Sequence, residues 1–174
     1  MGNIIYNKDR VNEKKKLLII EGAKIRFRNF KGEAGKYNRE GDRSFCVDIT
    51  DPEIAQQLTN DGWNVRILPA RSVDEDPIYY LQVKVSYNNR PPKIYLVTSK
   101  SEPRPLSEET VGMLDAIDIE HVDVTIRPYH YEVRGNSGIS AYVQELWVTM
   151  EEGYFDDKYR GRNSYTPDDV DPFE

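Results

Sequence analysis

Hydrophobic and polar residues alternate along seven short segments of the chain. A period of two places successive side chains on opposite faces of a β-strand. In the longest segment, Ala23, Ile25 and Phe27 are predicted to face the core, while the cationic residues between them face solvent. The predicted strands cover residues 17–30, 43–50, 63–67, 81–85, 94–98, 122–126 and 141–150.

Two segments depart from this alternation and predict short helices. Thr50 and Asp51 precede Pro52, which is typical of a helix N-terminus, and Gly62 marks the end of that helix. A second helix is predicted to begin at Ser107. The expected buried positions are Ile54, Ala55 and Leu58 in the first helix and Val111 and Leu114 in the second.

Turns rich in Gly, Pro and Asn separate the predicted strands, notably at residues 31–42, 87–92 and 135–138. Short strands between such turns favour an antiparallel sheet that is closed, or nearly closed, into a barrel. We therefore predict an all-β fold with two short helices, arranged as an elaborated oligonucleotide-binding (OB) barrel. A β-sandwich is the competing architecture.

The composition is that of one globular domain with additional arms. The chain has 174 residues, of which 38% are hydrophobic and 31% are charged. No apolar run approaches the roughly 18 residues of a membrane span, and no signal-peptide pattern is present, so we expect a cytoplasmic protein. The single cysteine, Cys46, excludes a disulfide within the chain and a Cys-based metal site.

Charge is distributed unevenly along the chain, although the net charge is −6. Residues 1–50 contain 12 Lys and Arg against 7 Asp and Glu, whereas residues 151–174 contain 3 against 8. The acidic total therefore does not exclude nucleic acid as a ligand of the basic first third. We predict a flexible N-terminal arm or early edge strand (1–16), an OB-like nucleic-acid-binding domain (17–150) and an acidic, largely disordered tail (151–174).

The best candidate binding segment is the first strand and the loop that follows it, because cations and aromatics alternate there. Single-stranded nucleic acid requires cations along its phosphates and flat faces against its bases. In an OB barrel, this strand and loop line the binding groove. The candidate nucleic-acid-binding residues of this segment are Arg26, Arg28, Phe30, Lys31, Lys36, Tyr37, Arg39 and Arg43.

Two further clusters are candidates for the same groove. One surrounds the connection between the fourth and fifth strands and contains Lys84, Tyr87, Arg90, Lys93 and Tyr95. The other is the run from Arg127 to Tyr131, in which Tyr129 is the candidate stacking residue. For both clusters, the alternative is an ordinary solvated strand end.

Signatures of enzymes are sparse, and we predict a protein without catalytic residues, cofactor or metal. His121 and His130 are the only histidines, and their spacing does not match a helical metal-ligand pair. The sequence contains no Gly-rich phosphate loop and no GxSxG elbow. An acidic cluster of Asp48, Asp123 and Glu145 that binds Mg²⁺ is the one alternative left open.

The end of the chain is an acidic run that leads into Pro-Phe. It resembles the C-terminal tip of bacterial single-stranded DNA-binding proteins and of replicative phage proteins with the same function. The matching residues are Asp168, Asp169, Asp171, Pro172 and Phe173. In those families Phe carries the terminal carboxylate that partners recognise, whereas here Glu174 follows. The alternative is a tail that serves only solubility.

The remainder of the chain also resembles a group of small phage-encoded single-stranded DNA-binding proteins. The similar segments are residues 27–32, 37–38, 43–48 and 62–65. The resemblance implies an OB barrel, sequence-tolerant binding of single-stranded DNA and a role in phage DNA replication or recombination in the host cytoplasm.

This resemblance and the charge distribution give one leading hypothesis and two alternatives. The acidic tail is expected to compete with DNA for the groove and to recruit replication or recombination proteins. The alternatives are a protein–protein interaction module, such as a phage factor that targets a host protein, and a single-stranded RNA-binding barrel.

Overall fold

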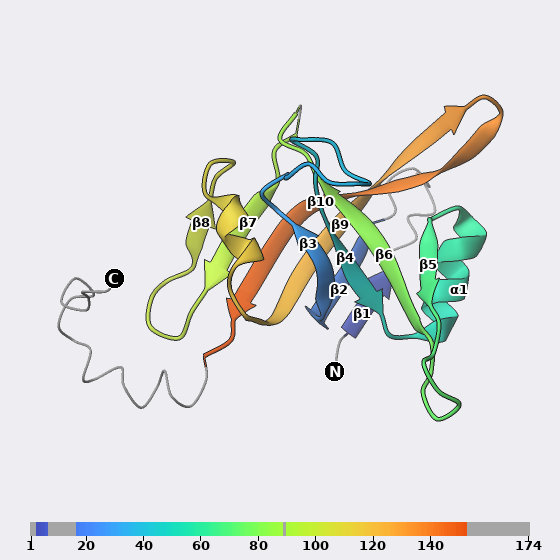
Figure 1. The fold of residues 1–174 in the computed structure, drawn as a ribbon, viewed down its shortest axis with the longest axis horizontal. Helices are drawn as coiled ribbons and strands as arrows, with labels where there is room; N and C mark the ends of the chain where they lie inside the picture. Colours follow the sequence, from blue (N-terminus) through green and yellow to red (C-terminus); the bar gives the residue numbers. More distant parts are fainter. Residues whose placement is uncertain (1–2, 7–16, 89, 153–174) are drawn as a thin grey trace.

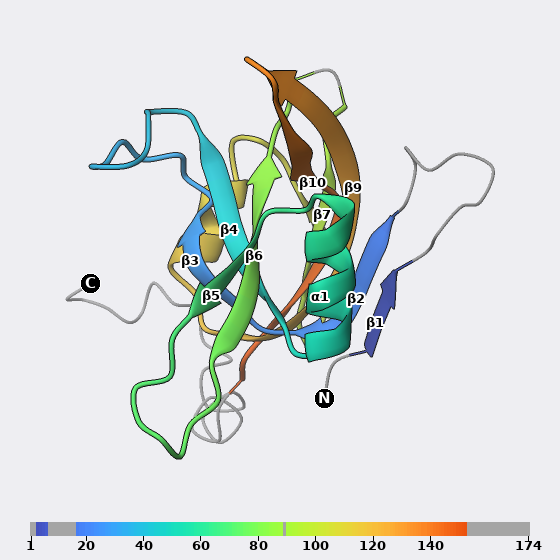
Figure 2. The ribbon, with the colours of Figure 1, turned by 90° about the vertical axis from the view of Figure 1, so that its right-hand side faces the viewer.

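The computed structural model describes residues 3–6, 17–88 and 90–152. These residues form one sheet that curls around a hydrophobic core, with a single α-helix packed beside it (Figures 1 and 2). In chain order the elements are β1 (Asn3–Tyr6), β2 (Leu18–Ala23), β3 (Ile25–Asn29), β4 (Arg43–Ile49), α1 (Pro52–Asp61), β5 (Val65–Leu68), β6 (Ile78–Val85), β7 (Lys93–Val97), β8 (Arg104–Leu106), η2 (Val111–Asp115), β9 (Ile119–Val133) and β10 (Asn136–Met150).

One bent segment joins the two sides of the curled sheet. The main path of the sheet runs β1-β2-β9-β10-β6-β4-β3. β2 pairs with β9 and β3 pairs with β4, yet only Lys24 separates β2 from β3. The carbonyl of Lys24 accepts a hydrogen bond from the Asp48 amide at 3.0 Å. The single strand predicted at 17–30 is thus two strands, and the bend carries the chain from one side of the sheet to the other.

The strand arrangement confirms the OB-like barrel and corrects one detail of it. The bent segment and β4, β6, β9 and β10 correspond to the five strands of an OB barrel. The sheet is mixed rather than antiparallel, because β10 runs parallel to both β6 and β7. The chain reaches β10 from β6 by way of β7, β8, η2 and β9, and this long crossover allows the parallel pairing.

Helix α1 forms for the reasons that the sequence indicates. The Asp51 side chain accepts a hydrogen bond from the Glu53 amide at 2.9 Å, and Pro52 occupies the first turn. Gly62 ends the helix with φ = 106°, a left-handed conformation that favours glycine. Ala55 and Leu58 are buried as predicted.

The second predicted helix is shorter and tighter than expected. Residues 107–110 form a turn, and the 3₁₀ helix η2 begins only at Val111. Val111 and Leu114 are fully buried, which confirms the predicted packing positions. The helix thus contributes its apolar side to the same core as the barrel strands.

A long hairpin of β9 and β10 projects from the barrel at the upper right of Figure 1. Its turn is formed by Arg134 and Gly135, at φ = 53° and 83°. Two consecutive positive φ values match the two-residue turns that continue the twist of paired strands. The predicted turn at residues 135–138 is therefore displaced, and the β-strand pairing begins at Asn136.

The N-terminal segment is described only in part. Asn3–Tyr6 pair antiparallel with β2 as an edge strand, which is the alternative predicted for the start of the arm. Residues 7–16 lie outside the described part of the chain. Within the described ranges there is no helix both long enough and apolar enough to cross a bilayer.

Candidate nucleic-acid interface

Four barrel strands present one row of outward side chains across the sheet. Ser44 on β4 lies opposite Lys84 on β6, Lys84 lies opposite Tyr142 on β10, and Tyr142 lies opposite Arg127 on β9. On β6 and β10 the residues that flank this row are buried in the core, as is Phe45 on β4. The pairing register therefore places cations and an aromatic ring side by side on the outer face of the barrel.

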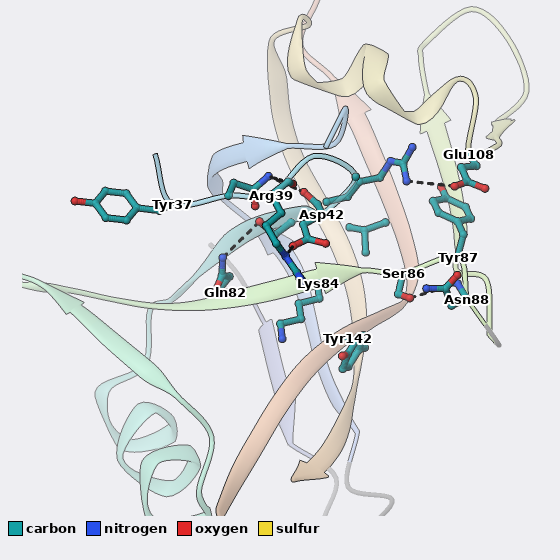
Figure 3. Close-up of a pocket in the computed structure, with 15 residues that line it drawn as sticks. Tyr37, Arg39, Asp42, Gln82, Lys84, Ser86, Tyr87, Asn88, Glu108 and Tyr142 are labelled. Carbon is teal, nitrogen blue, oxygen red and sulfur yellow. Dashed lines mark hydrogen bonds and ion pairs between the residues drawn. The ribbon is translucent and has the colours of Figure 1, made fainter. Parts of the chain in front are cut away.

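This face is hollowed into a groove. Two cavities of ≈ 460 Å³ each share Gln82, Lys84 and Tyr142, so we describe them together as the barrel groove. Figure 3 shows the first cavity, with Tyr37 and Arg39 on one side and Tyr87 and Glu108 on the other. The remaining groove residues are Asn38, Gly41, Asp42, Arg43, Ser44, Val85, Ser86 and Asn88 in the first cavity, and Asn64, Arg66, Leu81, Tyr129, Tyr131, Ile139, Ser140 and Ala141 in the second.

Tyr142 is the centre of an aromatic and cationic cluster in the groove. Its ring centroid lies 5.8 Å from Lys84 Nζ and 5.6 Å from Arg127 Cζ. The Tyr129 ring meets it edge-on, with the centroids 6.0 Å apart and an interplanar angle of 81°. Both cation distances fall within the range of cation–π attraction. The cluster therefore holds flat apolar faces beside positive charge.

The other end of the groove contains two further tyrosines. Tyr37 is 90% exposed, with Lys36 Nζ 5.4 Å from its ring centroid. Tyr87 lies with the Arg43 guanidinium 5.5 Å from its ring centroid. The Tyr87 hydroxyl is buried and has no hydrogen-bond partner among the described residues. Burial raises the pKa of Tyr87, so its hydroxyl is protonated at neutral pH.

Carboxylates accompany both arginines of the first cavity. Arg39 Nε lies 3.3 Å from Asp42 Oδ2, and Arg43 Nη1 lies 3.3 Å from Glu108 Oε2. These side chains line the groove together with Lys84. A ligand phosphate would therefore have to compete with protein carboxylates for the two guanidinium groups.

Three predicted binding residues have partners inside the protein, and for the fully buried Phe30 the prediction is corrected. Phe30 is fully buried and stacks on Phe45 at 5.2 Å, so it cannot stack on a base. Arg26 forms two 2.7 Å hydrogen bonds to the Asp48 carboxylate. Arg28 donates to the carbonyls of Leu114 and Ile117, both at 2.7 Å, and so ties β3 to η2 and the residues after it.

The other predicted residues lie in the barrel groove, on the exposed surface or in a separate cavity. Lys84, Tyr87 and Tyr129 line the barrel groove, as do Tyr37, Arg39 and Arg43. Lys36 is exposed beside Tyr37, and the exposed Lys31 follows the buried Phe30. Arg90 and Lys93 line a separate cavity of ≈ 360 Å³ with Arg127. Burial lowers the pKa of Arg127, and the charge of Arg90 adds to this effect.

Sequence reasoning missed Tyr142 and Arg66 as groove residues. Tyr142 occupies the polar position between the buried Ala141 and Val143, which is a signal that the alternation contains. Its role emerges only from the register, which brings β10 beside β6 and β9.

The remaining site predictions concern acidic residues. Asp48 binds Arg26, Asp123 accepts from the Gly22 amide and Glu145 accepts from the Trp147 indole. The described residues contain no group of three potential ligands that could hold a metal ion. The predicted tail contacts of Asp168, Asp169, Asp171, Pro172 and Phe173 lie outside the described residues and stay predictions.

Comparison with solved structures shows a similar fold in a phage protein. The single-stranded DNA-binding protein from bacteriophage Enc34, C-terminal truncation, aligns with a TM-score of 0.51 and 10% identity, over 87% of this chain and 97% of that chain. The structure of the Enc34 protein in complex with ssDNA aligns with a TM-score of 0.46 and 11% identity, over 87% of this chain and 97% of that chain. The single-stranded DNA-binding protein of bacteriophage T7 aligns with a TM-score of 0.36 and 10% identity, over 87% of this chain and 98% of that chain.

Comparison with protein families gives an assignment for nearly the whole chain. No curated protein matches it in sequence. Residues 8–170, however, match the family described as "Putative phage ssDNA-binding domain". This match includes every strand of the barrel and both sides of the groove. The chain therefore belongs to the family of phage single-stranded DNA-binding domains.

Proposed function

We propose that the protein binds single-stranded DNA in the barrel groove, with little dependence on base sequence. The observation that carries the proposal is the outward row Lys84–Tyr142–Arg127, which sets cations beside an aromatic ring on the face that OB barrels use for oligonucleotides. Family membership supports the same ligand. Stacking on aromatic rings tolerates any base, because every base has a π-face.

The groove suggests a role for each type of side chain along the strand. Arg39, Lys84 and Arg66 line the groove and would contact phosphates, together with Lys36 beside Tyr37, which makes binding dependent on salt. Tyr37, Tyr129 and Tyr142 would stack on bases. The role is non-catalytic, in phage DNA replication or recombination in the host cytoplasm. The domain would span residues 17–150, and the tail at 151–174 would compete for the groove.

Titration of the full chain with oligonucleotides tests this function. Oligo-dT, a mixed-sequence DNA strand, oligo-rU and duplex DNA are added separately, and tyrosine and tryptophan fluorescence is followed at two salt concentrations. We expect similar affinities for both DNA strands, weaker binding of the duplex and looser binding at high salt. Equal or tighter binding of oligo-rU would favour an RNA-binding barrel. Failure to bind any nucleic acid would favour a protein-interaction module.

Replacement of Glu108 by glutamine should strengthen binding of oligo-dT. Glu108 Oε2 lies 3.3 Å from Arg43 Nη1, so loss of its charge releases the guanidinium for a phosphate. Because the carboxylate is about half exposed, the expected gain is about two- to fivefold at low salt, and smaller at high salt. Fluorescence titration at both salt concentrations measures it.

The matched control is Glu102→Gln, which removes an equal charge from an exposed residue outside the groove. If the affinity for oligo-dT rises equally in both variants, the change in net charge explains the effect. In that case the Arg43–Glu108 pair does not restrain binding.

A further inference from the structure

Phe27 has an unusual backbone and an unusual exposure for a phenylalanine within a strand. Its φ is 54°, in the left-handed region that residues with a Cβ rarely adopt. It lies at a shift in the register between β3 and β4, between the pairs of Arg26 and Asn29. The side chain is 59% exposed. A strained conformation that exposes an aromatic ring is unexplained by core packing and is typical of functional sites.

The bulge moves Phe27 to the outer face of the barrel. Regular alternation would place its side chain inward, two residues after Ile25. Instead its ring meets that of Tyr80 on β6 edge-on, with centroids 5.7 Å apart and an interplanar angle of 68°. Tyr80 lies two residues before Gln82 on β6, so it points to the same side of the sheet as Gln82 and Lys84. The aromatic pair is therefore on the groove face.

Arg66 connects this pair to the barrel groove. It lies opposite Tyr80 in the pairing of β5 with β6, and it also lines the second cavity with Gln82. Within the described ranges, Arg66 forms no ion pair with a carboxylate. A cation thus lies between the second cavity and the Phe27–Tyr80 pair, where a phosphate leaving that cavity would pass.

We propose that Phe27 and Tyr80 form a second base-stacking site, which extends the barrel groove along β6 past Arg66. The inference rests on the proposed function and adds to it a longer path for the DNA. Bases would reach this site only after filling the groove, so its contribution depends on the length of the strand. The competing role is structural, with the Phe27 ring packing over the neighbouring barrel strands.

The test uses Phe27→Gly in the full chain, because glycine adopts a positive φ and preserves the bulge. Affinity and melting temperature are measured with oligo-dT from about 4 to about 16 nucleotides, the range of OB-fold site sizes. We expect unchanged affinity for the shortest oligonucleotide that binds. For the longest, we expect a loss of about 5- to 150-fold, which corresponds to one stacked base. The melting temperature should be equal or higher, since the strain is relieved.

A second variant and a control separate the outcomes. Tyr80→Ala should give the same length-dependent loss, and Ile67→Ala, which removes an equally exposed apolar side chain from β5, should give none. An equal loss at all lengths with a lower melting temperature would assign Phe27 a structural role. Unchanged affinity at all lengths would also overturn the second site. If the unaltered chain binds no oligonucleotide, the proposed function itself fails.

Discussion

Replacement of Tyr142 by alanine is expected to weaken binding of single-stranded DNA about 5- to 150-fold, the range for loss of one stacked base. Tyr142 lies at the junction of the two cavities, within 6 Å of the cationic groups of Lys84 and Arg127. It also supports the Tyr129 ring. Its removal therefore affects both halves of the groove. Fluorescence titration with oligo-dT measures the loss.

Salt dependence separates the stacking role of Tyr142 from the role of its charged neighbours. Because tyrosine neutralises no phosphate, Tyr142→Ala should leave the slope of log affinity against log salt unchanged. Lys84→Ala should instead reduce that slope by about one. If Tyr142→Ala changes the slope as much as Lys84→Ala does, the ring acts by positioning cations and not by stacking.

Two control variants define the contribution of the ring itself. Tyr142→Phe keeps the aromatic face and should bind as the unaltered protein does. Tyr95→Ala removes a tyrosine that stacks on Trp147 at 4.2 Å, on β7 outside the groove. We expect it to retain affinity in its folded form. A comparable loss in Tyr95→Ala would mean that altered folding, and not the groove, explains the result for Tyr142.

Phe27 in β3 and Phe30 just after it show where the alternation of hydrophobic and polar residues predicts burial correctly and where that prediction fails. A period of two assigned Phe27 to the core and allowed Phe30 to face a ligand. The structure has the opposite arrangement, with Phe27 59% exposed and Phe30 fully buried. One residue in the left-handed region shifts the pairing, so the side chains that follow it in this segment change face. A pattern of residue types contains no information about such a bulge.

The approximate location of the groove could be predicted from the sequence, but the contacts between its side chains could not. The basic loop after β3 and the tyrosines near strand ends were visible as local composition, and Tyr37, Arg39, Lys84 and Tyr129 do line the groove. The contact of Tyr142 with Lys84 depends on a parallel pairing between strands more than fifty residues apart. Likewise, the partners of Arg28 come from η2 and the residues after it. Long-range register decides both, and a single sequence does not encode it locally.

Replacement of Phe30 by alanine is expected to lower the free energy of unfolding by about 3–5 kcal/mol, the usual range for loss of a buried phenylalanine. The ring is fully buried and stacks on Phe45 at 5.2 Å, so its loss leaves a cavity between β3 and β4. This is a large fraction of the stability of an ordinary domain. Urea unfolding followed by tryptophan fluorescence measures it.

The affinity of the folded Phe30→Ala protein decides between the two roles that the sequence allows for Phe30. Truncation of a residue that stacks on bases lowers the affinity for DNA and leaves the stability of the protein unchanged. Truncation of a core residue lowers the stability and leaves the affinity of the folded protein unchanged. Phe30→Leu fills part of the cavity and should recover part of the lost stability. Phe27→Ala serves as the matched exposed control and should change the free energy of unfolding much less. If Phe30→Ala unfolds at the same urea concentration as the unaltered chain but binds oligo-dT weakly, the ring faces the DNA and the assignment of Phe30 to the core is wrong.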